Sequence, residues 1–432
     1  MSGKSPLRVG VCGNGTVGGG TIELLRRQGE LLAQRAGRDI VLQRIGARSD
    51  RDDCPAGEVP VHRDLLQVAE ADDVDVLVEC IGGTELARTL VERALEAGKS
   101  VVTANKALIA EQGNALVAAA ERRGVSLRFE AAVAGSIPII KALREGMAGN
   151  RVHGIAGIIN GTGNFILTAM GSGERGFAEV LAQAQSLGYA EADPSFDVEG
   201  IDAAHKLTIL ASVAFGMPLD FDAVSCEGIS AVTPDDIRYA AELGYRIKHL
   251  GIAKRREDGV ELRVHPTLLP ADALLANVDG VLNAVRLHSD AAGPTVYSGA
   301  GAGRLPTASA VLADIVDIAR EGGAPAPLGV PGPALRRLPV LPRDAVRCPW
   351  YLRMTLVDRP GVMSQLANCL GAEGISIEAL IQKPPQGGAA TVPVVVLTDA
   401  APEADLRRAV AAIAALDAVQ DTPHGIRVET LE

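Results

Sequence analysis

The stretch VGVCGNGTVGGG, from Val9 to Gly20, places six glycines where an apolar strand pattern runs into a helical one. Glycine costs a helix interior about 1 kcal/mol relative to alanine, so backbone without side chains must be needed here. In GxGxxG spacing, the first glycine permits a tight turn, the second lets the backbone approach a pyrophosphate, and the third packs the helix on the strand. The stretch predicts a dinucleotide-binding loop, with a glycine-rich turn that binds nothing as the alternative. The loop residues are Gly13, Asn14, Gly15, Thr16, Val17 and Gly18.

Strand and helix patterns alternate around this loop over the first 135 residues. Strands are expected at residues 7–13, 40–47, 74–82, 100–104 and 126–131, and helices at residues 21–32, 85–98 and 107–124. This order predicts βαβ units, and so an α/β, Rossmann-type domain with a parallel sheet covered on both faces.

The end of the second expected strand indicates which dinucleotide binds. NAD-binding domains usually carry an acidic residue there for the ribose 2′-hydroxyl, but this strand ends in Ala47, Arg48 and Ser49. A guanidinium binds phosphate through two hydrogen bonds, so Arg48 favours NADP. A solvated surface arginine is the alternative, and the nearby Asp50 leaves NAD open.

The rest of the chain divides by composition. Residues 138–298 are expected to form an α+β domain for substrate binding and dimerisation, and residues 299–323 to return to the dinucleotide-binding domain of residues 1–137. Residues 324–349 hold seven prolines in 26 positions, which is typical of a semi-stiff linker. Residues 350–432 show a βαββαβ order, with a hairpin across PPQGG at 384–388, and predict a ferredoxin-like domain.

Composition excludes several classes of protein. A net charge of −11 and an aromatic content of 3% argue against nucleic-acid binding and against binding to a membrane surface. No apolar run reaches the ~18 residues that suggest a membrane helix. The six cysteines include no CxxC pair, so reduced thiols and a cytoplasmic location are expected.

The stretch SLGYAEADPSFDVEGIDAAHKLTIL, residues 186–210, carries the chemistry. If it is helical from Asp197 onward, Asp202 and Lys206 lie on the apolar face that also holds Val198, Ile209, Leu210 and Val213. Charges on such a face are costly unless they are paired or functional, although a surface salt bridge is the alternative. Lys106 follows an expected parallel strand at the sheet edge where ligands bind, and Glu191 lies in a turn-rich lead-in.

Six segments in order resemble homoserine dehydrogenases that carry a C-terminal ACT domain: GNGTVGGG, TANKALIA, FEAAVAGSIPII, IINGTGNFIL, GYAEADPSFDVEGIDAAHKL and GAGAG. The resemblance implies NAD(P)H-dependent interconversion of L-aspartate 4-semialdehyde and L-homoserine, in threonine, methionine and isoleucine biosynthesis. It implies that Lys206 is the proton donor and that Lys106 contacts substrate and nicotinamide. It further implies substrate contacts at Glu191, Asp202, Asp197, Tyr189, Gly161 and Thr162, and cofactor contacts at Thr103, Gly188 and Gly303. Backbone carbonyls of Glu130, Val133, Gly135 and Ile137 would hold Na+ or another monovalent cation.

The tail LVDRPGVMSQLANCLGAEGISIEAL resembles an ACT domain, in which Asp358 to Gly361 would form an amino-acid-binding loop. The resemblance implies feedback inhibition by threonine and a homodimer or homotetramer, and a dimerisation unit without a ligand is the alternative. A chain ending near Pro349 is expected to keep activity and lose threonine sensitivity.

Two other functions stand as alternatives. An ACT-containing 2-hydroxyacid dehydrogenase would need a catalytic histidine beside a carboxylate, and none of the seven histidines is so placed. A non-catalytic protein that senses NADP and an amino acid would not need Lys106, Glu191, Asp202 and Lys206 together.

Overall fold

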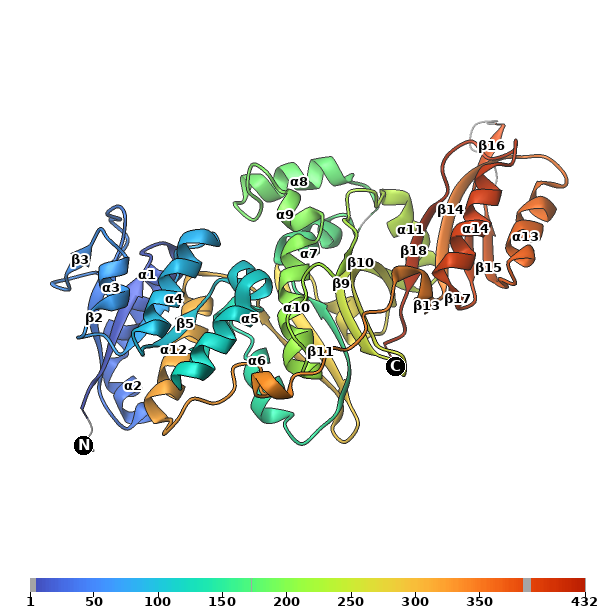
Figure 1. The fold of residues 1–432 in the computed structure, drawn as a ribbon. Coiled ribbons are helices and arrows are strands. Elements are labelled where there is room, and N and C mark those ends of the chain that lie inside the picture. Colours follow the sequence, from blue (N-terminus) through green and yellow to red (C-terminus); the bar gives the residue numbers. More distant parts are fainter. Residues whose placement is uncertain (1–4, 172, 384–389, 432) are drawn as a thin grey trace.

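The computed structural model describes residues 5–171, 173–383 and 390–431. Figure 1 shows three parts in a row: an N-terminal α/β part, a central part built on a mixed sheet, and a C-terminal part at the opposite end. Among the described residues, no helix is both long and apolar enough to cross a membrane.

The N-terminal part has a parallel sheet in the order β3-β2-β1-β4-β5-β6, which confirms the predicted Rossmann-type fold. Its strands are β1 Leu7–Cys12, β2 Ile40–Gly46, β3 Val61–His62, β4 Val76–Glu79, β5 Ser100–Thr103 and β6 Leu127–Arg128. The helices are α1 Thr16–Arg27, α2 Gly29–Ala36, α3 Leu66–Glu70, α4 Glu85–Glu96 and α5 Lys106–Arg123. The helix expected at residues 21–32 is in fact two, α1 and α2, which meet at Gln28. The short β3 and α3 were not predicted, because two to five residues carry too little periodicity.

The glycines of the opening loop have separate structural reasons. Gly13 has a φ of +101°, and a Cβ there would clash with the carbonyl oxygen of Cys80. A Cβ on Gly18 would clash with the carbonyl oxygen of Gly13, whereas Gly15 faces open space. Gly20 leaves room for the backbone of Arg304, the first residue of α12 Arg304–Arg320. The extra glycines therefore let α12 pack on α1, and Figure 1 shows this late helix among the early elements.

The central part is built on the strand order β12-β11-β7-β9-β10, with β8 paired to β10. The strands are β7 Val152–Ile158, β8 Ser225–Cys226, β9 Tyr245–Arg255, β10 Val260–Pro270, β11 Leu282–Ser289 and β12 Gly293–Ala300. The helices are α6 Ile139–Lys141, α7 Gly161–Ala169, α8 Phe177–Ser186, α9 Ser195–Val198, α10 Ile201–Phe215 and α11 Pro234–Glu242. The helix expected to run on from Asp197 is interrupted. Gly200 adopts a φ of +86° between α9 and α10, where a Cβ would press on Cys226 and His249.

The C-terminal part has the predicted βαββαβ order. Its elements are β14 Trp350–Val357, α13 Val362–Ala372, β15 Ile377–Gln382, β16 Thr391–Thr398, α14 Glu403–Ala414 and β18 His424–Val428, with a small β13 Arg347–Cys348 and β17 Ala401–Pro402 pair. The sheet order is β18-β14-β16-β15. The turn expected across PPQGG at 384–388 lies outside the described residues.

The central and C-terminal sheets are continuous. Strand β18 pairs in parallel with β10 through Thr267 and Arg427, and a guanidinium nitrogen of Arg427 lies 2.8 Å from Glu227. Residues 324–349 do not form a free connector, because Leu328 is fully buried and Val340 forms a β-bridge with Val260. Ending the chain near Pro349 would therefore remove β18, one of the strands paired to β10, and would take Arg427 from Glu227 and Glu429 from the buried Arg263. The expectation that the ACT domain can be cut away cleanly is not supported.

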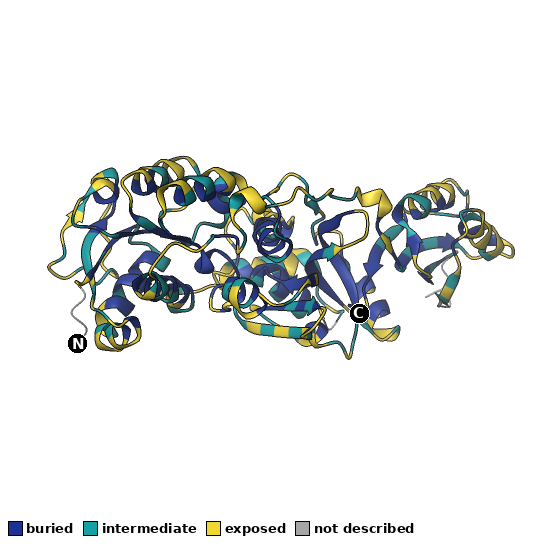
Figure 2. Cartoon of the chain, turned by 60° about the horizontal axis from the view of Figure 1, so that its bottom comes forward, coloured by how far each residue is buried: buried dark blue, intermediate teal, exposed yellow. Residues whose placement is uncertain are grey.

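Buried residues follow both sheets, and exposed residues lie on the outer faces of the helices (Figure 2). Strands β1, β4 and β5 are almost wholly buried, as expected of parallel strands covered on both faces. Burial on both faces holds these strands rigidly, and their carboxyl ends lead into the glycine-rich loop and into Lys106.

Candidate functional site

A cleft of about 330 Å³ lies at the carboxyl ends of β1, β4 and β5. Val17, Glu79, Gly83, Asn105, Lys106 and Phe196 are among its lining residues. The order of the strands reverses between β1 and β4, which is where open α/β sheets bind their ligands. Phe196 belongs to α9 of the central part, so the cleft lies between the cofactor loop and that part.

Hydrogen bonds around the end of β5 place Lys106. The hydroxyl of Thr103 donates to the Glu79 carboxylate at 2.5 Å, and the amide of Asn105 donates to the Gly83 carbonyl at 2.6 Å. Asn105 Oδ1 accepts from Leu108 N and so caps α5. Burial raises the pKa of Glu79. Lys106 starts α5, and its Nζ lies 5.4 Å from the centre of the Phe196 ring. Thr103 therefore does not line the cleft but holds Glu79 and Asn105 in place, whereas Lys106 is one of the lining residues.

Asp202 and Lys206 stand one turn apart on α10, and the side chain of Lys206 is only 11% exposed. Lys206 Nζ donates to Asp202 Oδ2 at 2.6 Å and to the Ile159 carbonyl at 2.7 Å. The other oxygen of Asp202 lies 3.0 Å from Lys106 Nζ. An ammonium has three N–H groups, so Lys206 keeps one for a further acceptor. The predicted placement of this charged pair on a buried face is therefore observed.

The environment separates the charge states of the two acids. Burial alone would raise the pKa of Asp202, but the charges of Lys206 and Lys106 outweigh it and hold that pKa below its usual range. Burial raises the pKa of Asp197, and the charge of Asp202 adds to this effect. Burial lowers the pKa of Lys206, against the attraction of Asp202. The site thus holds a firmly ionised Asp202 beside a lysine that releases its proton more readily than a surface lysine.

Sequence reasoning missed Asn160. Its Nδ2 donates to Asp197 Oδ1 at 2.7 Å and to Asp202 Oδ2 at 2.8 Å, and its Oδ1 accepts from Gly163 N. The available signal was an asparagine directly before the helix GTGN, a common capping pattern.

The other predicted substrate residues surround this cluster at different depths. Gly161 and Thr162 start α7, and the Thr162 hydroxyl donates to the Tyr189 carbonyl at 2.7 Å. The exposed Tyr189 ring packs edge-on against Phe165. Glu191 is exposed, and within the described residues no hydrogen bond or ion pair joins its carboxylate to Lys106, Asp202 or Lys206. Hydrogen bonds thus join Asp197 and Asp202 through Asn160, whereas the Tyr189 ring and the Glu191 carboxylate make no hydrogen bond to this cluster in the part of the chain that the structure describes.

The remaining cofactor residues lie at the rim of the N-terminal part. Arg48 is exposed just beyond β2, beside Ser49, whose carbonyl accepts from Asn14 Nδ2 at 2.8 Å. Gly188 and Gly303 adopt φ values of +74° and +134°, the latter directly before α12.

The four residues expected to hold a cation lie in a buried loop after β6. Glu130 N donates to Asp314, and the Glu130 carboxylate accepts from Ile140 N and Lys141 N. Within the described residues, no group donates to the carbonyl oxygens of Val133 and Gly135, although both residues are buried. Such orphaned carbonyls are unfavourable unless a ligand satisfies them.

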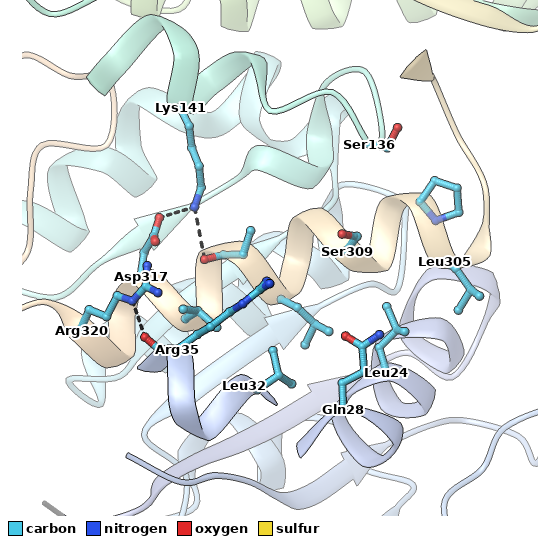
Figure 3. A pocket seen from close by; sticks show the side chains of 14 residues that line it. Leu24, Gln28, Leu32, Arg35, Ser136, Lys141, Leu305, Ser309, Asp317 and Arg320 are labelled. Atoms are coloured by element: carbon cyan, nitrogen blue, oxygen red, sulfur yellow. Dashed lines mark hydrogen bonds and ion pairs between the residues drawn. The ribbon is translucent and has the colours of Figure 1, made fainter. Parts of the chain in front are cut away.

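A larger hollow of about 740 Å³ lies between α1, α2 and α12, with Lys141 at its edge (Figure 3). Lys141 pairs with Asp317 across it, and Arg320 donates to the Arg35 carbonyl at 2.6 Å. It contains none of the predicted site residues, so the smaller cleft is the candidate active site.

A GxGxxG loop at the switch point of a Rossmann sheet and a buried lysine beside a carboxylate define a nicotinamide-dependent dehydrogenase, here with a ferredoxin-like C-terminal domain. Family models described as "Homoserine dehydrogenase, NAD binding domain", "Homoserine dehydrogenase" and "ACT domain" match residues 13–130, 138–316 and 350–415. A homoserine dehydrogenase of Pseudomonas aeruginosa is 53% identical over 99% of both chains. The crystal structure of a homoserine dehydrogenase from Thiobacillus denitrificans is 50% identical, covers 100% of both chains and has a TM-score of 0.95.

A hyperthermophilic archaeal homoserine dehydrogenase in complex with NADPH is 28% identical, covers 72% of this chain and 97% of its own, and has a TM-score of 0.63. The chain belongs to the homoserine dehydrogenase family, which confirms the resemblance. It is an NAD(P)-dependent oxidoreductase that acts on a CH–OH group and carries an ACT domain. The 2-hydroxyacid dehydrogenase and the non-catalytic sensor are thereby excluded.

Proposed function

We propose that Lys206 is the proton donor and acceptor in the interconversion of L-aspartate 4-semialdehyde and L-homoserine. One observation carries this assignment. Lys206 is buried and fixed by the Asp202 carboxylate and the Ile159 carbonyl, with one N–H left for an oxygen of the substrate.

A bound nicotinamide supplies or takes up the hydride in this reaction. As the aldehyde is reduced, negative charge develops on its oxygen, and the Lys206 ammonium stabilises that charge and delivers the proton of the new hydroxyl. Asp202 keeps Lys206 charged, and in the oxidation direction Lys206 takes the hydroxyl proton back. Lys106 starts α5 in the dinucleotide-binding part and pairs with Asp202 in the central part, so it would contact both the nicotinamide and the substrate. Glu191 and Asp202 would bind the substrate's ammonium and hydroxyl ends, with help from Gly161, Thr162 and Tyr189, while Asp197 supports the pocket.

NADP is the proposed cofactor. Arg63 Nη1 donates to the Ala47 carbonyl at 3.1 Å, and Arg63 Nη2 lies 2.6 Å from Asp50. Two exposed arginines, Arg48 directly after Ala47 and Arg63 bonded to the Ala47 carbonyl, are thus available near the end of β2 to bind a ribose 2′-phosphate. Arg63 also pairs with Asp50, the nearby acidic residue that had left NAD open. The archaeal relative's complex with NADPH supports this choice.

The loop at Glu130, Val133, Gly135 and Ile137 fits Na+ or another monovalent cation. The carbonyl oxygens of Val133 and Gly135 accept no hydrogen bond from the described residues and are the hard ligands that such an ion takes, whereas those of Glu130 and Ile137 already accept from Val133 N and Ile139 N. Asp314 beside the loop has one carboxylate oxygen without a partner among the described residues. These groups would fix the loop that joins the N-terminal part to the central one.

Threonine is the proposed effector, bound at the loop from Asp358 to Gly361, where Gly361 has a φ of +92° at the start of α13.

We also propose a homodimer or homotetramer, a cytoplasmic location and a role in threonine, methionine and isoleucine biosynthesis. The domain limits of residues 1–137 with 299–323, 138–298, 324–349 and 350–432 stay predictions.

The assignment is tested by following NADPH absorbance. Full-length enzyme with NADP should turn over L-homoserine and leave 3-phosphoglycerate unchanged. Turnover should be lost in Lys206→Met while NADP still binds. Equal turnover of wild type and Lys206→Met would overturn the role of Lys206.

A further inference from the structure

Asn160 is the junction at which the polar groups of the active site meet. It lies between β7 and α7 and is 6% exposed. Its amide nitrogen binds one oxygen of Asp197 and one of Asp202, and the preceding carbonyl, of Ile159, binds Lys206. One turn of chain thus contacts three of the proposed site residues.

We propose that Asn160 is a positioning residue, which holds Asp197 and Asp202 side by side in register with Lys206. The inference rests on the proposed function of Lys206 and Asp202, and adds a residue that the predictions did not contain. Asn160 itself touches neither substrate nor cofactor in this scheme.

A capping role alone does not explain an asparagine here. The cap needs only the side-chain oxygen, which accepts from Gly163 N at 2.7 Å, and serine or aspartate caps a helix about as well. The two N–H groups of the amide are directed instead at two acids. Among short side chains, only asparagine accepts at the cap and donates to two carboxylates without adding a charge.

The electrostatics give this arrangement a consequence. The titratable groups facing the cluster are Lys106 from α5, Asp197 from α9, and Asp202 and Lys206 from α10. His205 of α10, which lies 3.0 Å from the Glu111 carboxylate, interacts with both Lys106 and Asp202, and His249 of β9 approaches Gly163 beside Asn160. Two buried carboxylates side by side repel each other, and burial together with Asp202 already raises the pKa of Asp197. The amide of Asn160 bonds to both carboxylates, so it keeps them ionised and in place while Lys206 exchanges its proton.

Two substitutions separate positioning from packing. Asn160→Asp keeps the shape and the cap, and replaces the amide donor by a third acid. Asn160→Ser keeps a cap and removes both donors. The matched control is Asn164→Asp, because Asn164 is a buried asparagine on the same helix that donates to the carbonyls of Val278 and Leu282 and lies near Lys248, outside the site.

Full-length variants are compared by kcat/KM for homoserine from pH 5 to 10, by NADP titration and by thermal melting. We expect kcat/KM to fall about 100-fold in Asn160→Asp and about 10-fold in Asn160→Ser, the scale of misplaced catalytic groups. The acid limb of the profile should move to higher pH in both, because the acids then hold protons more tightly. The NADP dissociation constant and the melting temperature should stay close to those of Asn164→Asp.

Unmoved pH profiles would overturn the proposal, even if rates fell, because a packing defect lowers rates without shifting that limb. Loss of NADP binding or folding in Asn160→Ser, but not in Asn164→Asp, would also overturn it and make Asn160 structural. Lys206→Met serves as the reference. If Lys206→Met retains turnover, the proton-donor assignment is wrong. If Lys206→Met is inactive but both Asn160 variants keep full activity, only the positioning role of Asn160 is wrong.

Discussion

Lys106 and Lys206 bind opposite oxygens of one carboxylate, that of Asp202, at 3.0 and 2.6 Å. Lys106 starts α5 in the dinucleotide-binding part, and Lys206 lies on α10 in the central part. The two differ in access, since their side chains are 32% and 11% exposed. Asp202 therefore links a lysine of the dinucleotide-binding part to a lysine of the central part, and the more deeply buried of the two, Lys206, is the one proposed as proton donor.

The first prediction separates the two lysines. Lys206→Met should lower turnover about 10²- to 10⁴-fold, the usual scale for general acid–base catalysis, with NADP affinity nearly unchanged. The matched control is Lys248→Met, because Lys248 is a buried lysine that likewise binds one carbonyl and one aspartate, Val278 and Asp279. If Lys248→Met lost as much turnover, the effect of Lys206→Met would be one of folding. Near-wild-type turnover in Lys206→Met would leave Lys106 as the donor.

A second prediction concerns cofactor choice. Arg48→Ala and Arg63→Ala should each raise the Michaelis constant for NADP about tenfold or more and change that for NAD much less, because a charge-assisted bond to phosphate is lost. Arg255→Ala, at an exposed arginine at the end of β9, is the control. Steady-state kinetics with both cofactors decide the matter. Equal effects on NAD and NADP would make Arg48 an ordinary surface residue.

The burial of Asp202 and Lys206 on one helix face could be predicted because its evidence is local, although the break at Gly200 was not. Asp202 and Lys206 are four residues apart on an apolar stripe, so burial of the pair follows from helical periodicity. The contacts of Asn160 to Asp197 and Asp202 span 37 and 42 residues, and an amide has no titration signature to draw attention. Strands β10 and β18 are separated even farther along the chain. An alternating apolar pattern predicts that a strand is buried, but it does not predict which strand pairs with it. The sheet that joins the ACT domain to the central part therefore needed the structure.

The third prediction addresses regulation. Threonine at millimolar concentration should inhibit the full-length enzyme, and Asp358→Ala should weaken that inhibition at least tenfold without changing turnover in its absence. An effector must bind two states unequally, with a typical coupling of about 1–3 kcal/mol. A point substitution is used in place of a truncation that removes residues 350–432. Such a truncation would also remove Arg427, which is buried against Glu227 and Glu403. Inhibition curves measured with threonine and with other amino acids identify the effector. A full-length enzyme indifferent to threonine excludes it.

The last prediction concerns acid stability. His249 is buried between the starts of α7 and α10, and a Cβ on Gly200 would lie 3.0 Å from its ring. Its Nε2 donates to the Glu227 carbonyl at 2.9 Å, while its Nδ1 has no partner. Burial lowers the pKa of His249 to about 4, because a proton on Nδ1 would have no acceptor.

The sign of the pH effect follows from that lowered pKa. An unfolded chain takes up the proton near pH 6.5, whereas the folded chain resists it until about pH 4. The stabilisation from neutral His249 is therefore complete above about pH 6.5 and is lost progressively as pH falls towards 4, by about 3 kcal/mol in all. His249→Gln should lower the melting temperature at pH 7.5, through lost packing, but show a smaller further drop between pH 7.5 and 4.5 than wild type. His153→Gln, at an exposed histidine on β7, should follow the wild-type slope. Parallel slopes for His249→Gln and wild type would show that His249 does not control acid unfolding.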